Sequence, residues 1–178
     1  MNFVANRYMA FSGIANFMLM QRRQERKMPT ISTRRAEVAD AATVARFVHA
    51  LLEEISGGKV PGIETVMQSA ETVLADVGVV AVIACEDHEP VGVMVLNECT
   101  AIYAGGKFGE ISELYVRPDM RSQGIAPHLI AVALAEGRAR GWKRLEVGAP
   151  GQPKWQRTLD FYLRNGFEEV GPRLRRII

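Results

Sequence analysis

Residues 113–126 read ELYVRPDMRSQGIA, and this run joins a predicted strand, a turn and a predicted helix. The strand covers 108–117 and ends at Pro118, because proline has no N–H to donate to a sheet ladder. The helix covers 125–140 and is rich in alanine and leucine. The first N–H groups of a helix have no intrahelical partner, and the helix dipole adds positive potential there. The run therefore predicts an anion-binding loop, in which Gly124 lets a ligand approach the backbone.

The segments around this loop predict an α/β domain with a mixed sheet and helices on both faces, in the order β-α-α-β-β-β-α-β-α-β. The expected strands cover 31–35, 77–84, 91–96, 108–117, 143–147 and 167–170. The expected helices cover 41–55, 63–75, 125–140 and 155–164. Asp40 is expected to cap the first helix.

The composition is that of an ordinary globular protein. The 178 residues fit one domain, and 48% hydrophobic with 24% charged residues excludes wholesale disorder. A net charge of +2 gives no reason to expect nucleic acid or an anionic membrane as a partner. A nucleic-acid site would have to use basic residues with few aromatic neighbours, namely Arg121, Arg138, Arg140, Lys143 and Arg144. We therefore expect no nucleic-acid partner.

The two cysteines, Cys85 and Cys99, lie in neighbouring apolar runs on either side of an expected hairpin turn. In such a hairpin they stand several pairs apart, too far for a disulfide, whose Cα atoms approach within about 7 Å. We expect two free thiols, in agreement with a reducing cytoplasm. Two cysteines and three histidines also give no basis for a structural zinc site, so no metal is expected.

The first 28 residues differ from the domain expected at 29–178. An apolar run at 8–20 is too short to span a bilayer, which takes about 20 residues. Its basic residues mostly follow the run, whereas a secretory signal has them ahead of it. Three interpretations stay open: an extension before a true start at Met28, a loosely ordered arm or partner helix, and a weak membrane-surface or targeting helix. None implies stable membrane insertion.

Three positions of the loop, Arg121, Gly124 and Ala126, match a known signature, Arg/Gln-x-x-Gly-x-Gly/Ala. Their context adds to the match, because residues 113–118 (ELYVRP) precede the loop and residues 161–167 (FYLRNGF) follow about 40 residues later. From Ile31 to the C-terminus, the chain thereby resembles the GNAT acetyltransferase superfamily. The resemblance implies an enzyme that transfers the acetyl group of acetyl-CoA directly to a primary amine.

The resemblance also implies how acetyl-CoA is held. The amides from Ser122 to Ala126 would bind the pyrophosphate, the Val116 main chain would pair with the pantetheine arm, and the Leu114 N–H would serve the thioester carbonyl. The full set of implied cofactor-binding residues is Leu114, Tyr115, Val116, Arg121, Ser122, Gln123, Gly124, Ile125 and Ala126. The alternative for the hexapeptide alone is a plain helix start with a surface arginine.

A lysine-like acceptor amine, with a pKa of about 10.4, is neutral in only about one molecule in 2,500 at pH 7, so a base is needed. Strand alternation places Glu110 and Leu114 on one face and Glu113 on the other, unless a bulge intervenes. By the resemblance Glu110 is the first candidate base. Glu113 is the second, and two solvated glutamates without a role are the alternative.

Tyr162 matches the family tyrosine that lies near the sulfur and would protonate the departing thiolate, unless it is an aromatic core residue. Trp155 stands where many relatives have an asparagine that contacts the coenzyme. Arg157 or Gln156 could replace that contact, or Trp155 could pack over the cofactor or in the core.

The resemblance implies that the acceptor is set by the loops 56–61 and 171–178, and Glu53 and Glu54 could attract a cationic amine to the rim. A small-molecule amine is favoured over a peptide, and a homodimer is compatible with the resemblance. Two alternatives stay open: a protein Nα or lysine acetyltransferase, and a non-catalytic acyl-CoA-binding or sensor module.

Overall fold

The computed structural model describes residues 30–171 and 174–176, so the expected extension at 1–28 lies outside the described residues. Two short 3-10 turns, Val38–Asp40 and Pro118–Met120, precede α2 and α4 respectively. The helices and strands are β1 (Ile31–Arg35), α2 (Ala41–Ser56), α3 (Ile63–Leu74), β2 (Val79–Glu86), β3 (Glu89–Ala101), β4 (Gly106–Val116), α4 (Ile125–Ala139), β5 (Leu145–Val147) and α5 (Gln156–Arg164).

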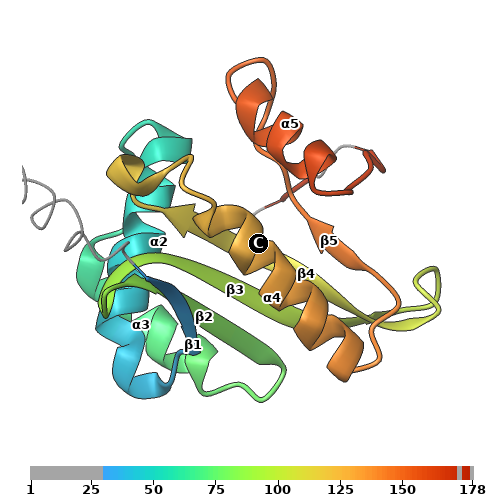
Figure 1. The fold of residues 1–178 in the computed structure, drawn as a ribbon, viewed down its shortest axis with the longest axis horizontal. Helices are drawn as coiled ribbons and strands as arrows, with labels where there is room; N and C mark the ends of the chain where they lie inside the picture. The colour runs from blue at the N-terminus through green and yellow to red at the C-terminus, as the bar shows by residue number, and fades with distance from the viewer. Residues whose placement is uncertain (1–29, 172–173, 177–178) are drawn as a thin grey trace, which may run out of the picture. The chain divides into compact units, whose positions relative to one another are not determined.

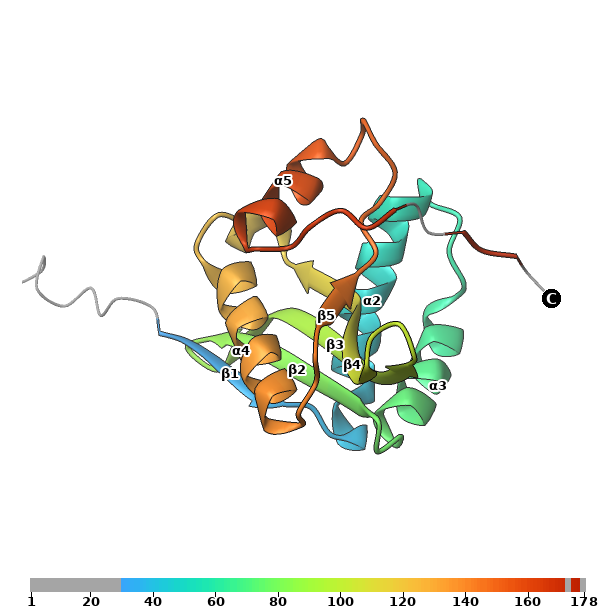
Figure 2. The same cartoon turned by 90° about the vertical axis from the view of Figure 1, so that its right-hand side faces the viewer.

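The strands form a five-stranded mixed sheet in the order β1-β2-β3-β4-β5 (Figure 1). The first four strands pair with one another in antiparallel fashion, and β5 runs parallel to β4. The helices α2 and α3 cover one face and α4 covers the other (Figure 2). The predicted α/β class with a mixed sheet is therefore confirmed.

Each face of the sheet has its own hydrophobic core. On β2, Val80 and Val82 belong to the core beneath α4 and α5, whereas Ala81 and Ile83 belong to the core beneath α2 and α3. Because both faces are covered, β2 is a nearly continuous apolar run, as strands in the middle of layered α/β domains are.

Two local expectations were wrong. Residues 167–170 form no strand: the Phe167 N–H donates to Tyr162 O at 3.1 Å, in the turn that closes α5, and Val170 is 85% exposed. Asp40 precedes α2 but does not cap it with its side chain. Its carboxylate instead accepts hydrogen bonds from Arg34 and from the Glu37 N–H, which lower the pKa of Asp40 to about 2.

Strands β4 and β5 pair over a short distance and then diverge. The last pair is Ile111 with Val147, where β5 ends, while β4 continues to Val116. Residues 112–116 are therefore hydrogen-bonded to β3 on one edge and, within 30–171 and 174–176, have no neighbouring strand on the other. An open strand edge can accept an extended ligand as an added strand.

A β-bulge interrupts β4 at the start of this open section. In the pairing with β3, Glu113 lies opposite Val95 and Ile111 lies opposite Leu96, so Ser112 is the additional residue. A bulge shifts the alternation of side chains by one position. Glu110 and Glu113, which regular alternation would place on opposite faces, can therefore lie on one face. In agreement, the charge of Glu110 acts on the Glu113 carboxyl and contributes to a raised pKa there.

Trp142 sets the position of the chain that leads into β5. Its ring packs on the Cα of Gly109 and near Gly137, and its Nε1–H donates to Glu98 at 2.9 Å. A methyl group at Gly109 would collide with the indole ring. We expect Gly109→Ala to lower the free energy of unfolding by about 1–3 kcal/mol in denaturant titrations. Gly151→Ala is the control, because nothing lies within 4 Å of a Cβ there, and an unchanged Gly109→Ala variant would contradict this packing.

Cys85 and Cys99 are thiols and form no disulfide with each other, as expected. In the part of the chain that the structure describes, no helix is long and apolar enough to cross a membrane.

Candidate active site

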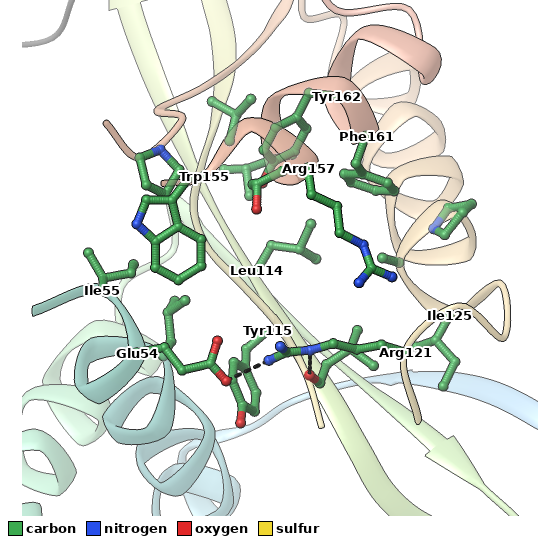
Figure 3. A pocket seen from close by; sticks show the side chains of 18 of the residues that line it. Glu54, Ile55, Leu114, Tyr115, Arg121, Ile125, Trp155, Arg157, Phe161 and Tyr162 are labelled. Atoms are coloured by element: carbon green, nitrogen blue, oxygen red, sulfur yellow. Dashed lines mark hydrogen bonds and ion pairs between the residues drawn. The ribbon is translucent and has the colours of Figure 1, made fainter. Parts of the chain in front are cut away.

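A cavity of about 580 Å³ opens where β4 and β5 diverge (Figure 3). Leu51 and Glu54 line it from α2, whereas Ile125 and Tyr162 line it from α4 and α5. Since α2 and α4 cover opposite faces of the sheet, the cavity connects the two faces along the open edge of β4. Two molecules that approach from opposite sides could meet at this edge.

The open edge presents the backbone of Leu114 and Val116. The Arg117 N–H donates to Val91 O on β3 at 2.9 Å, and hydrogen-bonding direction alternates along a strand. The peptide groups of Leu114 and Val116 therefore point away from β3. The Val116 carbonyl confirms this direction, because it accepts a hydrogen bond from Arg121 Nε at 2.9 Å. The bulge at Ser112 decides which peptide groups of β4 point towards the open edge.

The predicted anion loop lies at the end of the cavity next to α4. Its backbone turns through left-handed conformations at Ser122 (φ +64°) and Gly124 (φ +83°). The first intrahelical bond of α4 joins the His128 N–H to Gly124 O, so the amides of Ile125 and Ala126 precede it. An N–H at position 127 would have no intrahelical partner, so Pro127, which lacks one, is tolerated there.

Two arginines lie near this loop, and they point to different places. Arg121 Nη2 forms an ion pair with Glu54 at 2.7 Å, and the Arg121 guanidinium lies 5.4 Å from the centre of the Tyr115 ring. Arg121 thus faces the β4 edge and α2. Arg157, from α5, donates to Ser122 Oγ at 3.0 Å. The side chain that reaches the anion loop is therefore that of Arg157.

Tyr162 is buried on the α5 side of the cavity, with 7% of its surface exposed. Its ring centre lies 5.2 Å from that of Phe161 and 5.4 Å from that of Phe167. Burial raises the pKa of the Tyr162 hydroxyl to about 12. The side chain is thus both part of an aromatic cluster and a protonated phenol at the cavity wall.

The two candidate bases lie beside the cavity rather than in its wall. Neither Glu110 nor Glu113 lines it, but Ser112 does. The Ser112 hydroxyl donates to the Glu113 carboxylate and accepts a hydrogen bond from Asn97 Nδ2 at 2.8 Å. Burial is the main cause that raises the pKa of Glu113; the Ser112 hydrogen bond opposes it, and the Glu110 charge adds to it.

Comparison with known proteins identifies this arrangement. The model of the acetyltransferase (GNAT) family matches residues 50–167. The chain belongs to the GNAT acetyltransferase family. It is therefore an acyltransferase, and the resemblance carried by the loop at 121–126 is confirmed.

Three relatives of this GNAT chain show how far the likeness extends. An aminoalkylphosphonate N-acetyltransferase of Salmonella typhimurium is 30% identical over 152 residues, which are 85% of this chain and 94% of that protein. A putative acetyltransferase from Arthrobacter sp. FB24 has 30% identity and a TM-score of 0.69, covering 83% and 96% of the two chains. The fold is also shared by a ribosomal-protein-alanine N-acetyltransferase from Brucella melitensis biovar Abortus 2308. That structure has 24% identity and a TM-score of 0.65, and the match covers 83% of this chain and 99% of that chain.

Trp155 is where this GNAT chain departs from the asparagine of many relatives. Trp155 lines the cavity just before α5, and Figure 3 shows its ring on the α2 side, whereas Arg157 reaches the α4 side. The Lys154 ammonium lies 5.4 Å from the centre of the Trp155 ring. Trp155 is therefore a wall of the cavity rather than a core residue.

Sequence reasoning did not single out Ser112 as a candidate residue. It becomes visible only from the strand register, because a bulge depends on the pairing partner and leaves no mark in one sequence. Among the described residues, no group of three or more His, Cys, Asp or Glu side chains is placed to hold a metal ion.

Proposed function

We propose that the chain is an N-acetyltransferase that transfers the acetyl group of acetyl-CoA directly to a primary amine. The observation that carries the proposal is the cavity along the open edge of β4, which reaches the anion loop on one side and α2 on the other. Acetyl-CoA, which supplies the activated acetyl group, would bind on the α4 side. The amine would arrive from the α2 side and meet the thioester at Leu114.

The residues present fit this cofactor. The amides of Ile125 and Ala126, free of intrahelical partners, are suited to the pyrophosphate, and the loop at Gly124 leaves open space beside them. The open edge at Leu114 and Val116 is suited to the amides of the pantetheine arm. Arg121 takes one lone pair of the Val116 carbonyl, which leaves a second for a ligand.

Proton transfer completes the proposed reaction. Glu113 or Glu110 would take the proton of the amine, and the Leu114 N–H would donate to the thioester oxygen as negative charge develops there. Tyr162 would donate its phenolic proton to the departing thiolate. These are the residues expected from the sequence, and the fact that Leu114 and Tyr162 both line the cavity supports the proposal.

Arg157 is proposed to supply the cation of the pyrophosphate site, in place of the missing asparagine contact. We expect Arg157→Ala to weaken acetyl-CoA binding about tenfold, which is the low end for a charged hydrogen bond at an exposed position. S-acetylpantetheine, which lacks the pyrophosphate, should bind the variant and the wild type equally. Calorimetry with both ligands measures this difference.

Arg138→Ala is the matched control, since it removes one positive charge in the last turn of α4, at the opposite end from the loop. An equal loss of affinity for both ligands in Arg157→Ala would contradict a pyrophosphate contact and indicate a structural role instead.

A small-molecule acceptor is favoured over a peptide. The α2 side of the cavity is bounded by Leu51, Glu54 and Ile55 and by Trp155, which together give an apolar wall with one carboxylate. The curated relative is named for aminoalkylphosphonates, which makes that class a candidate here. A peptide acceptor and a non-catalytic acyl-CoA sensor remain the alternatives.

Two measurements test the proposal in order. Calorimetry with acetyl-CoA comes first, and a Kd weaker than millimolar would exclude the cofactor. Thiol release is then followed with a panel of aminoalkylphosphonates, polyamines, aminoglycosides and N-terminal peptides. Binding without turnover on any amine would favour the sensor alternative.

A further inference from the structure

We infer that Ser112 is a catalytic residue that relays the proton of the acceptor amine to Glu113. The inference rests on the proposed function and assigns a route for its base. The observation behind it is a mismatch: the carboxylates of Glu110 and Glu113 stand outside the cavity wall, yet Ser112 lines the cavity and donates to Glu113. A base must reach its proton within hydrogen-bond distance or through one intervening group.

The bulge in β4 puts Ser112 in this position. Ser112 is the residue that the bulge inserts, and it stands where the last β4–β5 pair ends and the open edge begins. Leu114, whose N–H faces the open edge, follows two residues later on the same strand. An amine that attacks a thioester held at Leu114 therefore passes close to Ser112.

The hydroxyl is oriented for a relay. Asn97 Nδ2 donates to Ser112 Oγ at 2.8 Å, which directs the hydroxyl proton towards an acceptor. Two acceptors lie near: the Glu113 carboxylate, in direct contact, and Val95 O at 3.4 Å. The nearer and charged acceptor is Glu113.

The proton balance closes without another reactant. The acceptor ammonium loses one N–H bond as Ser112 Oγ gains that proton, and the Ser112 O–H proton passes to a Glu113 carboxylate oxygen. Ser112 ends as it began, Glu113 ends neutral, and the amine is left with the lone pair that attacks the thioester carbon. Glu113 returns the proton to solvent after each turnover.

The surroundings of Glu113 suit the role of acceptor. Burial and the neighbouring Glu110 carboxylate raise the pKa of Glu113, whereas the Ser112 hydroxyl lowers it. On β3, the strand paired with this section, the neutral Asn97 joins the network. A carboxyl with a raised pKa is a stronger base once ionised.

Three variants test the relay. Ser112→Ala should lower kcat about tenfold, which is less than the roughly 100-fold or more that a positioned base contributes, because Glu113 itself is kept. It should also move the acidic limb of the pH–rate profile to higher pH, because the hydrogen bond that lowers the Glu113 pKa is lost. Ser112→Thr keeps the hydroxyl and should retain most of the rate. Ser112→Ala combined with Glu113→Gln should be no slower than Glu113→Gln alone, since both act on one step.

A second readout does not depend on turnover. Carboxyl NMR of the substrate-free protein should show a higher Glu113 pKa in Ser112→Ala than in the wild type. An unchanged kcat and pH profile in Ser112→Ala, or independent losses in the double variant, would overturn the relay and leave the acetyltransferase proposal standing. No turnover of the wild type on any amine would overturn both.

Discussion

Tyr162→Phe is expected to lower kcat about 100-fold, because it removes the phenolic proton proposed for the departing thiolate, a role typically worth that much. The ring itself stays, so the stacking with Phe161 and Phe167 is preserved and the fold should be retained. The KM for acetyl-CoA should change little. Steady-state thiol release over a range of acetyl-CoA concentrations measures both parameters.

Tyr103→Phe is the matched control, since it makes the same chemical change at an exposed position on the chain between β3 and β4. If Tyr162→Phe turned over as fast as this control, Tyr162 would have no role as an acid and would be an aromatic core residue alone.

The raised pKa of Tyr162 also predicts how the stability difference between the wild type and Tyr162→Phe changes with pH. Folding favours the neutral phenol, so its contribution to stability is complete below pH 10, the usual pKa, and is lost as the pH rises towards 12. Between these values the wild type should lose stability faster than Tyr162→Phe does. Denaturant titrations of both proteins at several pH values follow this difference.

The anion loop, the strand before it and the helix after it could be predicted because the residues that define them act locally. Proline at 118 stops a strand, glycine at 124 takes a left-handed conformation, and the helix after it starts within one residue of the glycine. Each of these follows from the backbone preferences of single residues.

The parts that failed or were missed depend on partners distant in sequence. The role proposed for Ser112 depends on a register shift against Val95 and Leu96. The sequence could name Arg157 only as one of several replacements for the asparagine, because its contact with Ser122, 35 residues earlier, depends on the fold. The expected strand at 167–170 failed for the same reason: Phe167 packs against the core around Tyr162 instead of pairing with β5. Strand pairing and side-chain reach are decided by packing, which a single sequence does not encode locally.

Gly124→Val is expected to weaken acetyl-CoA binding at least about 100-fold, the largest effect proposed for this chain. A Cβ at Gly124 meets no atom within 4 Å, so the valine side chain would stand in the open space where the pyrophosphate is proposed to lie. The left-handed conformation of Gly124, at φ +83°, adds a backbone penalty of about 1–2 kcal/mol that has nothing to do with the ligand.

Gly141→Val separates the two effects, because Gly141 stands beyond the other end of α4 with φ +71° and also has nothing within 4 Å of an added Cβ. Both variants should lose a similar amount of stability in denaturant titrations, but only Gly124→Val should lose acetyl-CoA in calorimetry. Equal binding by the two variants would mean that the start of α4 does not hold the pyrophosphate. In that case the cavity along β4 would need another anchor for the cofactor, and Arg157 would be the side chain to test next.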